Sequence, residues 1–267
     1  MRKVPGGSKP KRICVVDVSR AYFYAKCRRP LYIQIPAEDW EPGDEDKIGK
    51  LHLSLYGTRD AAQNWAATYT EHLVKLGFVQ GRASLCNFRH DVKDIDLTVH
   101  GDDFLIVAGS EELRWMELQM KERYEVKCST LGPEPGMQPE VRILNRTLKW
   151  TPEGIEYESD PKHVKIVVHE CGVESGRTAR VPGSKRPEGP GEDQRLSDAE
   201  ASRYRAVVAR LNYMAMDRID LQFVAKNLSR KMASPTKADW EDVRRTARYL
   251  RHRPRAPQIF KFEQEVA

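Results

Sequence analysis

The spacing of apolar residues along the chain predicts alternating strands and helices. The clearest helix runs from Arg59 to Leu76, where apolar residues recur at steps of three and four and Gly77 follows as a helix-ending glycine. The other expected helices are Ser19–Lys26, Glu111–Arg123, Pro161–Cys171, Ser197–Arg210, Leu211–Lys231 and Ala238–Arg253. The expected strands are Lys11–Asp17, Leu31–Pro36, Lys50–Leu55, Ser84–Arg89, Leu97–Val99, Phe104–Ala108, Tyr124–Cys128, Val141–Trp150 and Gly154–Ser159. The pattern in the first half of the chain therefore predicts an α+β fold. Its elements follow the order βαββαβ, which is typical of a split sheet with helices on one face.

Three carboxylates stand at the ends of these expected strands. Asp17 ends the first strand, while Asp102 and Asp103 lie at the tip of the hairpin formed by Leu97–Val99 and Phe104–Ala108. A carboxylate near a core must be paired or bind a metal. If the strands are neighbours, these side chains can hold two divalent cations about 4 Å apart, the arrangement that phosphoryl-transfer enzymes use. A Gly-Asp-Asp turn without a ligand is the alternative.

Composition narrows the class of protein only slightly. The 267 residues allow one large domain or two modest ones, and the net charge of +6 is a mild indication of a polyanionic partner. Five cysteines without a C-x-x-C pair favour reduced thiols in an intracellular protein, cytoplasmic or nuclear. No apolar run approaches the length of a membrane-spanning helix.

Four blocks of sequence resemble the reverse transcriptase of copia-type LTR retrotransposons, from about Arg12 to Arg255. The first three are Val-Val-Asp-Val-Ser-Arg-Ala-Tyr at 15–22, Leu-Ser-Leu-Tyr-Gly-Thr-Arg-Asp-Ala-Ala-Gln-Asn-Trp at 53–65, and His-Gly-Asp-Asp at 100–103. The fourth is a C-terminal pattern containing Tyr204-Arg205, Leu228-Ser229-Arg230, Pro235-Thr236, Trp240 and Arg248-Tyr249-Leu250. Their correct order makes the resemblance specific, although His100-Gly101 stands where the family has Tyr-Val.

The resemblance implies a right-hand polymerase with a palm, a partial fingers insertion and a helical thumb. The expected stretches are a flexible N-terminus at 1–10, a palm at 11–130 with a fingers-like insertion at 30–57, a primer-grip-like hairpin region at 131–160, thumb or connection helices at 161–255 with a linker at 177–195, and a C-terminal tail at 256–267.

The implied function is RNA-directed DNA polymerisation by two-metal nucleotidyl transfer. It implies an RNA template, a DNA primer, deoxynucleoside triphosphates and two Mg²⁺ ions, or Mn²⁺ in their place. Asp17, Asp102 and Asp103 are the implied catalytic residues and metal ligands. Because consecutive strand residues point to opposite faces, we expect one of the Asp102–Asp103 pair to dominate coordination and prefer Asp102.

The resemblance also implies residues that contact the nucleotide: Val18, Tyr22, Tyr56 and Gly57. The Tyr22 ring would lie beneath the incoming sugar and exclude a 2′-hydroxyl, and a simple core position is the equal alternative. Lys127 would protonate the leaving group, although an ordinary surface lysine is the favoured interpretation.

The last expected helix carries a basic face formed by Arg244, Arg248 and Arg251 at positions i, i+4 and i+7. Such a face suits binding along a nucleic-acid backbone. A solvated cationic face is the alternative, and both fit a helix that packs through its opposite side.

Two hypotheses about activity follow. In the first, the chain is a reverse transcriptase core. In the second, it is a catalytically inactive, truncated remnant that keeps the palm fold and nucleic-acid binding. Only sixteen residues precede Asp17, where the family has a basic fingers segment, so this segment, RNase H and integrase would have to act in trans.

Overall fold

The computed structural model describes residues 10–183 and 194–262. The chain forms two compact units, 1–141 and 142–267, which we describe separately. Residues 1–9 of the predicted flexible N-terminus, 184–193 of the predicted linker and 263–267 of the predicted tail lie outside the described residues.

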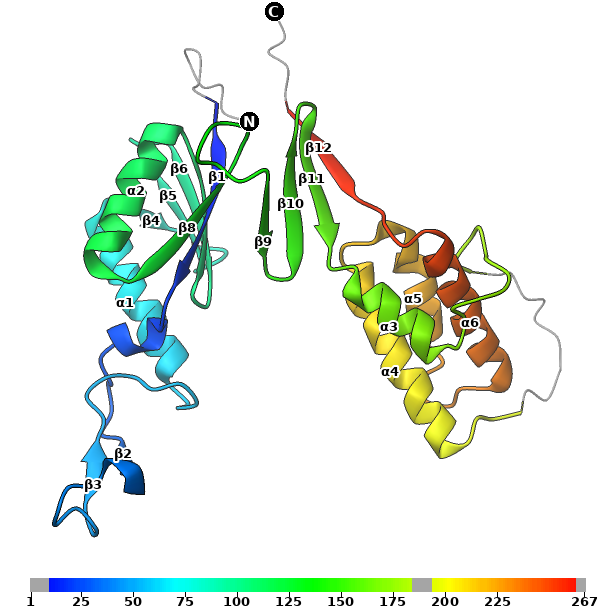
Figure 1. Cartoon of the computed structure of the whole chain (residues 1–267), viewed down its shortest axis with the longest axis horizontal. Helices are drawn as coiled ribbons and strands as arrows, with labels where there is room; N and C mark the ends of the chain where they lie inside the picture. Colours follow the sequence, from blue (N-terminus) through cyan, green and yellow to red (C-terminus); the bar gives the residue numbers. More distant parts are fainter. Residues whose placement is uncertain (1–9, 184–193, 263–267) are drawn as a thin grey trace, which may run out of the picture. The chain divides into compact units, whose positions relative to one another are not determined.

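The first unit contains a six-stranded antiparallel sheet with two helices on one face (Figure 1). In spatial order the strands are β4 (Val79–Gln80), β5 (Asn87–His90), β6 (Ile95–His100), β7 (Asp103–Ala108), β1 (Arg12–Val18) and β8 (Val126–Leu131). The helices are α1 (Ala61–Lys75) and α2 (Ser110–Arg123). The succession of β1, α1, β6, β7, α2 and β8 is the predicted βαββαβ order, to which β5 and the short β4 are added.

Alternation of side chains along the strands separates a buried face from an open one. Cys14, Val16 and Val18 of β1 belong to the same core cluster as Trp65 and Tyr69 of α1. The cluster also includes Phe104, Ile106 and Ala108 of β7 and Leu113, Met116 and Met120 of α2. Because the side-chain period of a strand is two, the residues between these positions, Asp17 among them, lie on the other face of the sheet.

An insertion between β1 and α1 differs from the expected elements. The helix expected at Ser19–Lys26 is only a 3₁₀ turn, η1 (Ala21–Tyr24). The second strand of the insertion pair is β3 (Ile48–Lys50), so the strand expected at Lys50–Leu55 was wrong. It pairs with β2 (Tyr32–Gln34) in an antiparallel register that runs from Tyr32 opposite Lys50 to Gln34 opposite Ile48. Short apolar runs flanked by Gly and Pro do not define strand ends by themselves.

The second unit begins with a four-stranded sheet in the order β12-β11-β10-β9. Its strands are β9 (Glu140–Ile143), β10 (Arg146–Thr151), β11 (Gly154–Ser159) and β12 (Gln258–Lys261). The single strand expected at Val141–Trp150 was wrong, because Leu144 and Asn145 have φ angles of 48° and 60° and turn the chain back. Part of the stretch expected as a tail, 256–267, instead supplies β12.

Helices α3 (Lys162–Glu170), α4 (Asp198–Ala215), α5 (Gln222–Ser229) and α6 (Lys237–His252) enclose a second core cluster. The helix boundary expected between Arg210 and Leu211 was wrong: α4 continues to Ala215, and the turn η3 (Ile219–Leu221) precedes α5. The predicted capping box of Ser197 and Glu200 begins α4, and Thr236 with Asp239 caps α6 in the same way. No helix in the described part of the chain is long and apolar enough to cross a bilayer.

Candidate active site

Four ionisable side chains form a row across the open face of the first sheet. Asp17 of β1 is paired in register with Asp103 of β7, which is itself paired with His100 of β6. On its other side Asp17 is paired with Lys127 of β8. Directly opposite residues of antiparallel strands point to the same face with Cβ atoms about 5 Å apart. The register therefore brings two predicted catalytic carboxylates together, with one basic group at each end of the row.

Asp102 occupies the turn between β6 and β7 rather than the ladder. Its side chain is exposed, and its main-chain carbonyl accepts a hydrogen bond of 3.1 Å from the Val18 amide. Gly101 makes the turn possible with a φ of 65°, which L side chains rarely adopt. The ladder therefore makes Asp103 the cross-strand neighbour of Asp17, while the expectation that Asp102 dominates metal coordination stays a prediction.

Trp65 of α1 fixes this turn from the buried side. Its indole nitrogen donates a hydrogen bond of 2.8 Å to the Gly101 carbonyl, and its side chain is almost fully buried. The sequence indicated only that Trp65 lies on the apolar face of a helix. The available signal was chemical, because a buried indole N–H usually requires an acceptor.

The electrostatics of the row centre on Asp103. Partial burial raises the pKa of the Asp103 carboxyl above its ordinary value, and the nearby negative charges of Asp102 and Asp17 raise it further. The charge of His100 acts in the opposite direction. Three carboxylates thus lie close enough to repel one another, which is the condition a cation relieves.

These carboxylates form an incomplete site for a cation. Within residues 10–183 and 194–262, no three His, Cys, Asp or Glu side chains are grouped closely enough to hold a metal ion by themselves. Mg²⁺ commonly binds through one or two carboxylates together with waters and substrate phosphates. The pair formed by Asp17 and Asp103, with Asp102 beside it, fits that requirement.

The predicted nucleotide-contacting residues Tyr22 and Tyr56 lie against each other. Their ring centroids are 4.4 Å apart, and the Tyr56 ring also meets Phe23 edge-on at 5.6 Å. Tyr56 is 46% exposed, whereas Tyr22 is half-buried and packs against the core cluster. The packing fits the expected core position of Tyr22, while the contact of its ring with an incoming sugar stays a prediction. Gly57 follows with a φ of 86°.

The ends of the insertion bring these two rings together. The Ser54 amide donates a hydrogen bond of 2.8 Å to the Ala25 carbonyl, and the Cys27 amide donates one of 2.9 Å to the His52 carbonyl. The chain therefore leaves after η1 and returns beside it, which places Tyr56 next to Tyr22.

The three predicted basic residues of α6 do not behave alike. Arg244 and Arg248 both approach the carboxylate of Glu241, at 2.8 and 3.7 Å. Arg251 instead donates hydrogen bonds to the main-chain carbonyls of Val173, at 2.6 Å, and Gly176. Arg251 therefore has a structural role within the second unit.

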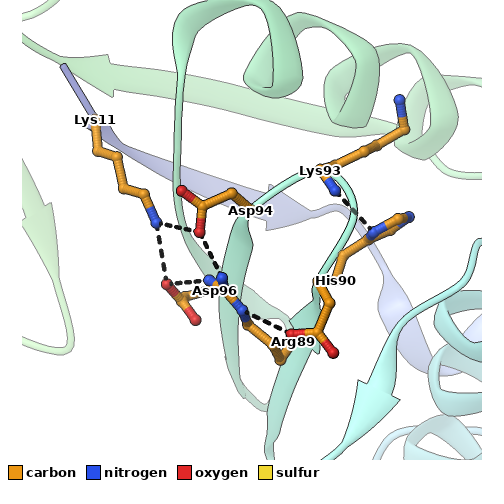
Figure 2. Close-up of polar contacts among 7 residues, drawn as sticks. Lys11, Arg89, His90, Lys93, Asp94 and Asp96 are labelled. Atoms are coloured by element: carbon orange, nitrogen blue, oxygen red, sulfur yellow. Dashed lines mark hydrogen bonds and ion pairs between the residues drawn. The ribbon is translucent and has the colours of Figure 1, made fainter. Parts of the chain in front are cut away.

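Ion pairs fix the β5–β6 hairpin at the other end of the open face (Figure 2). Arg89 contacts Asp94 at 2.5 Å and Asp96 at 2.9 Å, and Lys11 contacts the same two carboxylates at 2.9 and 3.5 Å. Asp94 adopts a φ of 53° at the hairpin turn. The hydrogen bonds with Lys11 and Arg89 lower the pKa of Asp94. This network holds the hairpin whose second strand, β6, ends at His100.

Comparison with known proteins identifies the first unit. Residues 8–133 match the family described as reverse transcriptase (RNA-dependent DNA polymerase). The chain is 24% identical over 243 residues to the retrovirus-related Pol polyprotein from transposon RE2 of Arabidopsis thaliana, covering 90% of this chain and 16% of that protein. It is 29% identical over 180 residues to the transposon Ty1-DR5 Gag-Pol polyprotein of Saccharomyces cerevisiae, covering 67% of this chain and 9% of that protein.

The chain thus contains a reverse transcriptase domain, which includes β1, the β6–β7 hairpin and α1. The two relatives named above are Pol polyproteins of copia-type retrotransposons, and the chain spans less than a fifth of the length of either. The sequence resemblance is confirmed by these matches.

Proposed function

We propose that the first unit is the catalytic core of an RNA-directed DNA polymerase. It would extend a DNA primer on an RNA template with deoxynucleoside triphosphates. The observation that carries this proposal is the in-register pairing of Asp17 with Asp103, beside Asp102, on the open face of a sheet that belongs to a reverse transcriptase domain.

In this proposal the six-stranded sheet is the palm of a right-hand polymerase, and residues 30–57 are a fingers-like insertion. Residues 131–160 form a primer-grip-like hairpin region, and the helices of 161–255 form the thumb. The open face of the sheet suits this role because, in the described part of the first unit, α1 and α2 both pack on the opposite face.

Asp17, Asp102 and Asp103 would hold two Mg²⁺ ions, or Mn²⁺ in their place, which lower the pKa of the primer 3′-hydroxyl and neutralise triphosphate charge. Trp65 and the Val18 amide hold the main chain of the turn that carries Asp102 beside the end of β1. The stacked rings of Tyr22 and Tyr56 offer a flat apolar surface to the sugar and base of the nucleotide, with Gly57 allowing close backbone approach. The carbonyl of Val18 is a further metal ligand in this proposal.

Primer extension on an RNA template with a DNA primer tests the proposal. The full chain, with Mg²⁺ and deoxynucleotides, is compared with Asp17→Asn, Asp102→Asn and the control Asp91→Asn, whose carboxylate is 77% exposed at the β5–β6 turn. We expect extension by the chain and by the control, and its loss in both active-site variants. Extension that persists in Asp17→Asn would contradict the assignment. Absence of extension, with primer–template binding retained, would favour a catalytically inactive chain that still binds nucleic acid.

A further inference from the structure

A polar pocket of about 510 Å³ lies in the second unit, between α6 and the segment 172–179 that follows α3. From α6 it is lined by Arg244, Arg245 and Arg248, and from the segment by Ser175, Arg177 and Thr178. The pocket is therefore walled by four guanidinium groups and two hydroxyl groups.

Hydrogen bonds hold the segment 172–179 on α6 and occupy two of its main-chain carbonyl groups. Arg251 donates hydrogen bonds to the carbonyls of Val173 and Gly176, and the Ala179 amide donates one of 3.5 Å to the Arg248 carbonyl. Main-chain carbonyls repel anions, so their use by Arg251 leaves the donor groups to dominate the pocket. The wall is also held in place before any ligand arrives.

Within the described residues, the four arginines of the pocket outnumber the carboxylates that form ion pairs with them. Glu241 approaches both Arg244 and Arg248, whose side chains are only 33% and 29% exposed. Arg245 uses its Nε to bind the Gly183 carbonyl at 3.0 Å, which leaves its terminal N–H groups for other partners. A guanidinium has five N–H donors, so Glu241 alone does not satisfy the donors of both Arg244 and Arg248. Partly buried like charges favour an anion that joins them.

We propose that this pocket binds a phosphate group, carried either by a nucleic-acid strand or by a free phosphorylated compound. Guanidinium groups match phosphate oxygens through paired charge-assisted hydrogen bonds, and hydroxyl groups add donors of the right length. The volume lies within the range of small-ligand sites, so it admits a phosphate together with the group attached to it.

This site goes beyond the polymerase centre and is independent of it. It lies on other elements, and its test requires binding rather than synthesis. The anion-binding residues of this proposal differ from those expected from the sequence. Arg244 and Arg248 are common to both sets, and the pocket adds Arg177 and Arg245. Arg251 is a positioning residue that holds the segment 172–179.

The test measures binding of two probes to the full chain. One probe is a fluorescein-labelled single-stranded oligodeoxynucleotide followed by anisotropy at several salt concentrations, and the other is inorganic pyrophosphate followed by calorimetry. One variant combines Arg177→Gln with Arg245→Gln and removes two guanidinium groups from the pocket. The other is Glu241→Gln, which removes the carboxylate that competes with an anion for Arg244 and Arg248. Arg230→Gln, at an exposed position just after α5, is the control. Thermal unfolding verifies that each variant is folded.

The double variant should weaken binding of at least one probe by about tenfold and, for the oligonucleotide, make the salt dependence shallower by about two released ions. Glu241→Gln should tighten the same binding, and Arg230→Gln should leave it unchanged. Pocket-dependent binding of the oligonucleotide identifies a strand as the source of phosphate, and pocket-dependent binding of pyrophosphate alone identifies a free compound.

Equal affinities for the double variant and the Arg230→Gln control, with both probes, would overturn the proposal. Displacement of the oligonucleotide by polyglutamate as effectively as by pyrophosphate would also overturn the proposal, since the pocket would then recognise negative charge alone. Because Glu241→Gln adds no bulk and removes no donor, its failure to tighten binding would count against the site even if the double variant were unstable.

Discussion

Asp103 faces another carboxylate across the β1–β7 ladder. Partial burial, together with the negative charges of Asp102 and Asp17, raises the pKa of its carboxyl. A carboxyl whose pKa is raised by folding binds protons more tightly in the folded state. Its charged form therefore destabilises the fold, and the loss of stability develops as pH rises from its ordinary pKa through its raised one.

We expect Asp103→Asn to stabilise the chain at neutral pH by about 0.2–1 kcal/mol in the presence of a chelator, because like charges directly opposite are unfavourable. The gain should vanish in acid, where Asp103 of the parent chain is protonated. Mg²⁺ should stabilise the parent more than the variant. Urea unfolding with chelator or Mg²⁺ provides the measurement, with Asp91→Asn as the control. A variant less stable than its parent at neutral pH would contradict this account of the row.

Asp94 shows the opposite linkage, because its ion pairs lower the pKa of the carboxyl. The stability it contributes is present above its ordinary pKa and is lost as pH falls through its lowered one. Asn is the appropriate replacement, since it tolerates the positive φ of 53° at this position while removing the charge.

We expect Asp94→Asn to lower the free energy of unfolding at neutral pH by up to about 1 kcal/mol, given that the carboxylate is 43% exposed. The difference from the parent should shrink as pH falls through the acid range. Asp91→Asn, which removes a more exposed partner of Arg89 at 3.4 Å, should have a smaller effect. Chemical unfolding across pH checks both, and equal effects of the two variants would show that the network in Figure 2 adds nothing specific.

At the scale of elements, α1 acts on the candidate site through a single hydrogen bond. Trp65 reaches the Gly101 carbonyl, so the helix holds the turn between β6 and β7 in place. Trp65→Phe keeps an aromatic ring in the core but leaves the carbonyl without its donor.

We expect Trp65→Phe to destabilise the chain by about 1–3 kcal/mol and, if the proposed activity holds, to slow primer extension at saturating nucleotide. Tyr69→Phe is the matched control, since Tyr69 lies on the same face of α1 and its ring belongs to the same aromatic cluster. Unfolding and extension assays together test the idea. If Trp65→Phe loses stability but extends the primer as fast as the parent chain, Trp65 contributes only to core packing and not to the geometry of the candidate site.

The elements that were predictable from the sequence are those defined by local spacing. Helix α1 follows from its apolar face and Gly77, and the β6–β7 hairpin follows from two apolar runs around Gly101. The register of β1 against β7 was not predictable, because it depends on residues about ninety positions apart. The carboxylates were therefore identified as candidates, while their pairing required the structure.

The errors arose where distant contacts or turn chemistry override local pattern. Asn145 lies in a turn inside a stretch whose apolar pattern predicts a continuous strand. Just after the end of α4, the buried Arg218 donates hydrogen bonds to the carbonyls of Arg253 and Pro254. Such contacts leave no periodic signal in the sequence around the helix end.

At the scale of the molecule, each unit has a core of its own. One core lies between the six-stranded sheet and the pair α1 and α2, and the other lies among α3, α4, α5 and α6. Independent cores of this size are characteristic of units that fold separately.

We expect fragments 1–139 and 140–267, cut so that β9 stays whole, to fold as separate chains. Each should unfold cooperatively in urea at a midpoint close to one of two transitions of the full chain. Circular dichroism and calorimetry of both fragments provide the measurement. A fragment 140–267 without a cooperative transition would show that its sheet and helices depend on the first unit.

The position of β12 also has a consequence for synthesis on the ribosome. All strands of the first sheet are present once Leu131 has been made. Strand β11 ends at Ser159, but its partner β12 (Gln258–Lys261) emerges only about a hundred residues after that. Until then Gly154–Ser159 exposes an unpaired edge, the kind of template on which nascent chains associate wrongly. The first unit has a similar interval, because β1 gains its partner β7 only after Asp103–Ala108 emerge. Both sheets are therefore vulnerable during translation until a distant strand has been made.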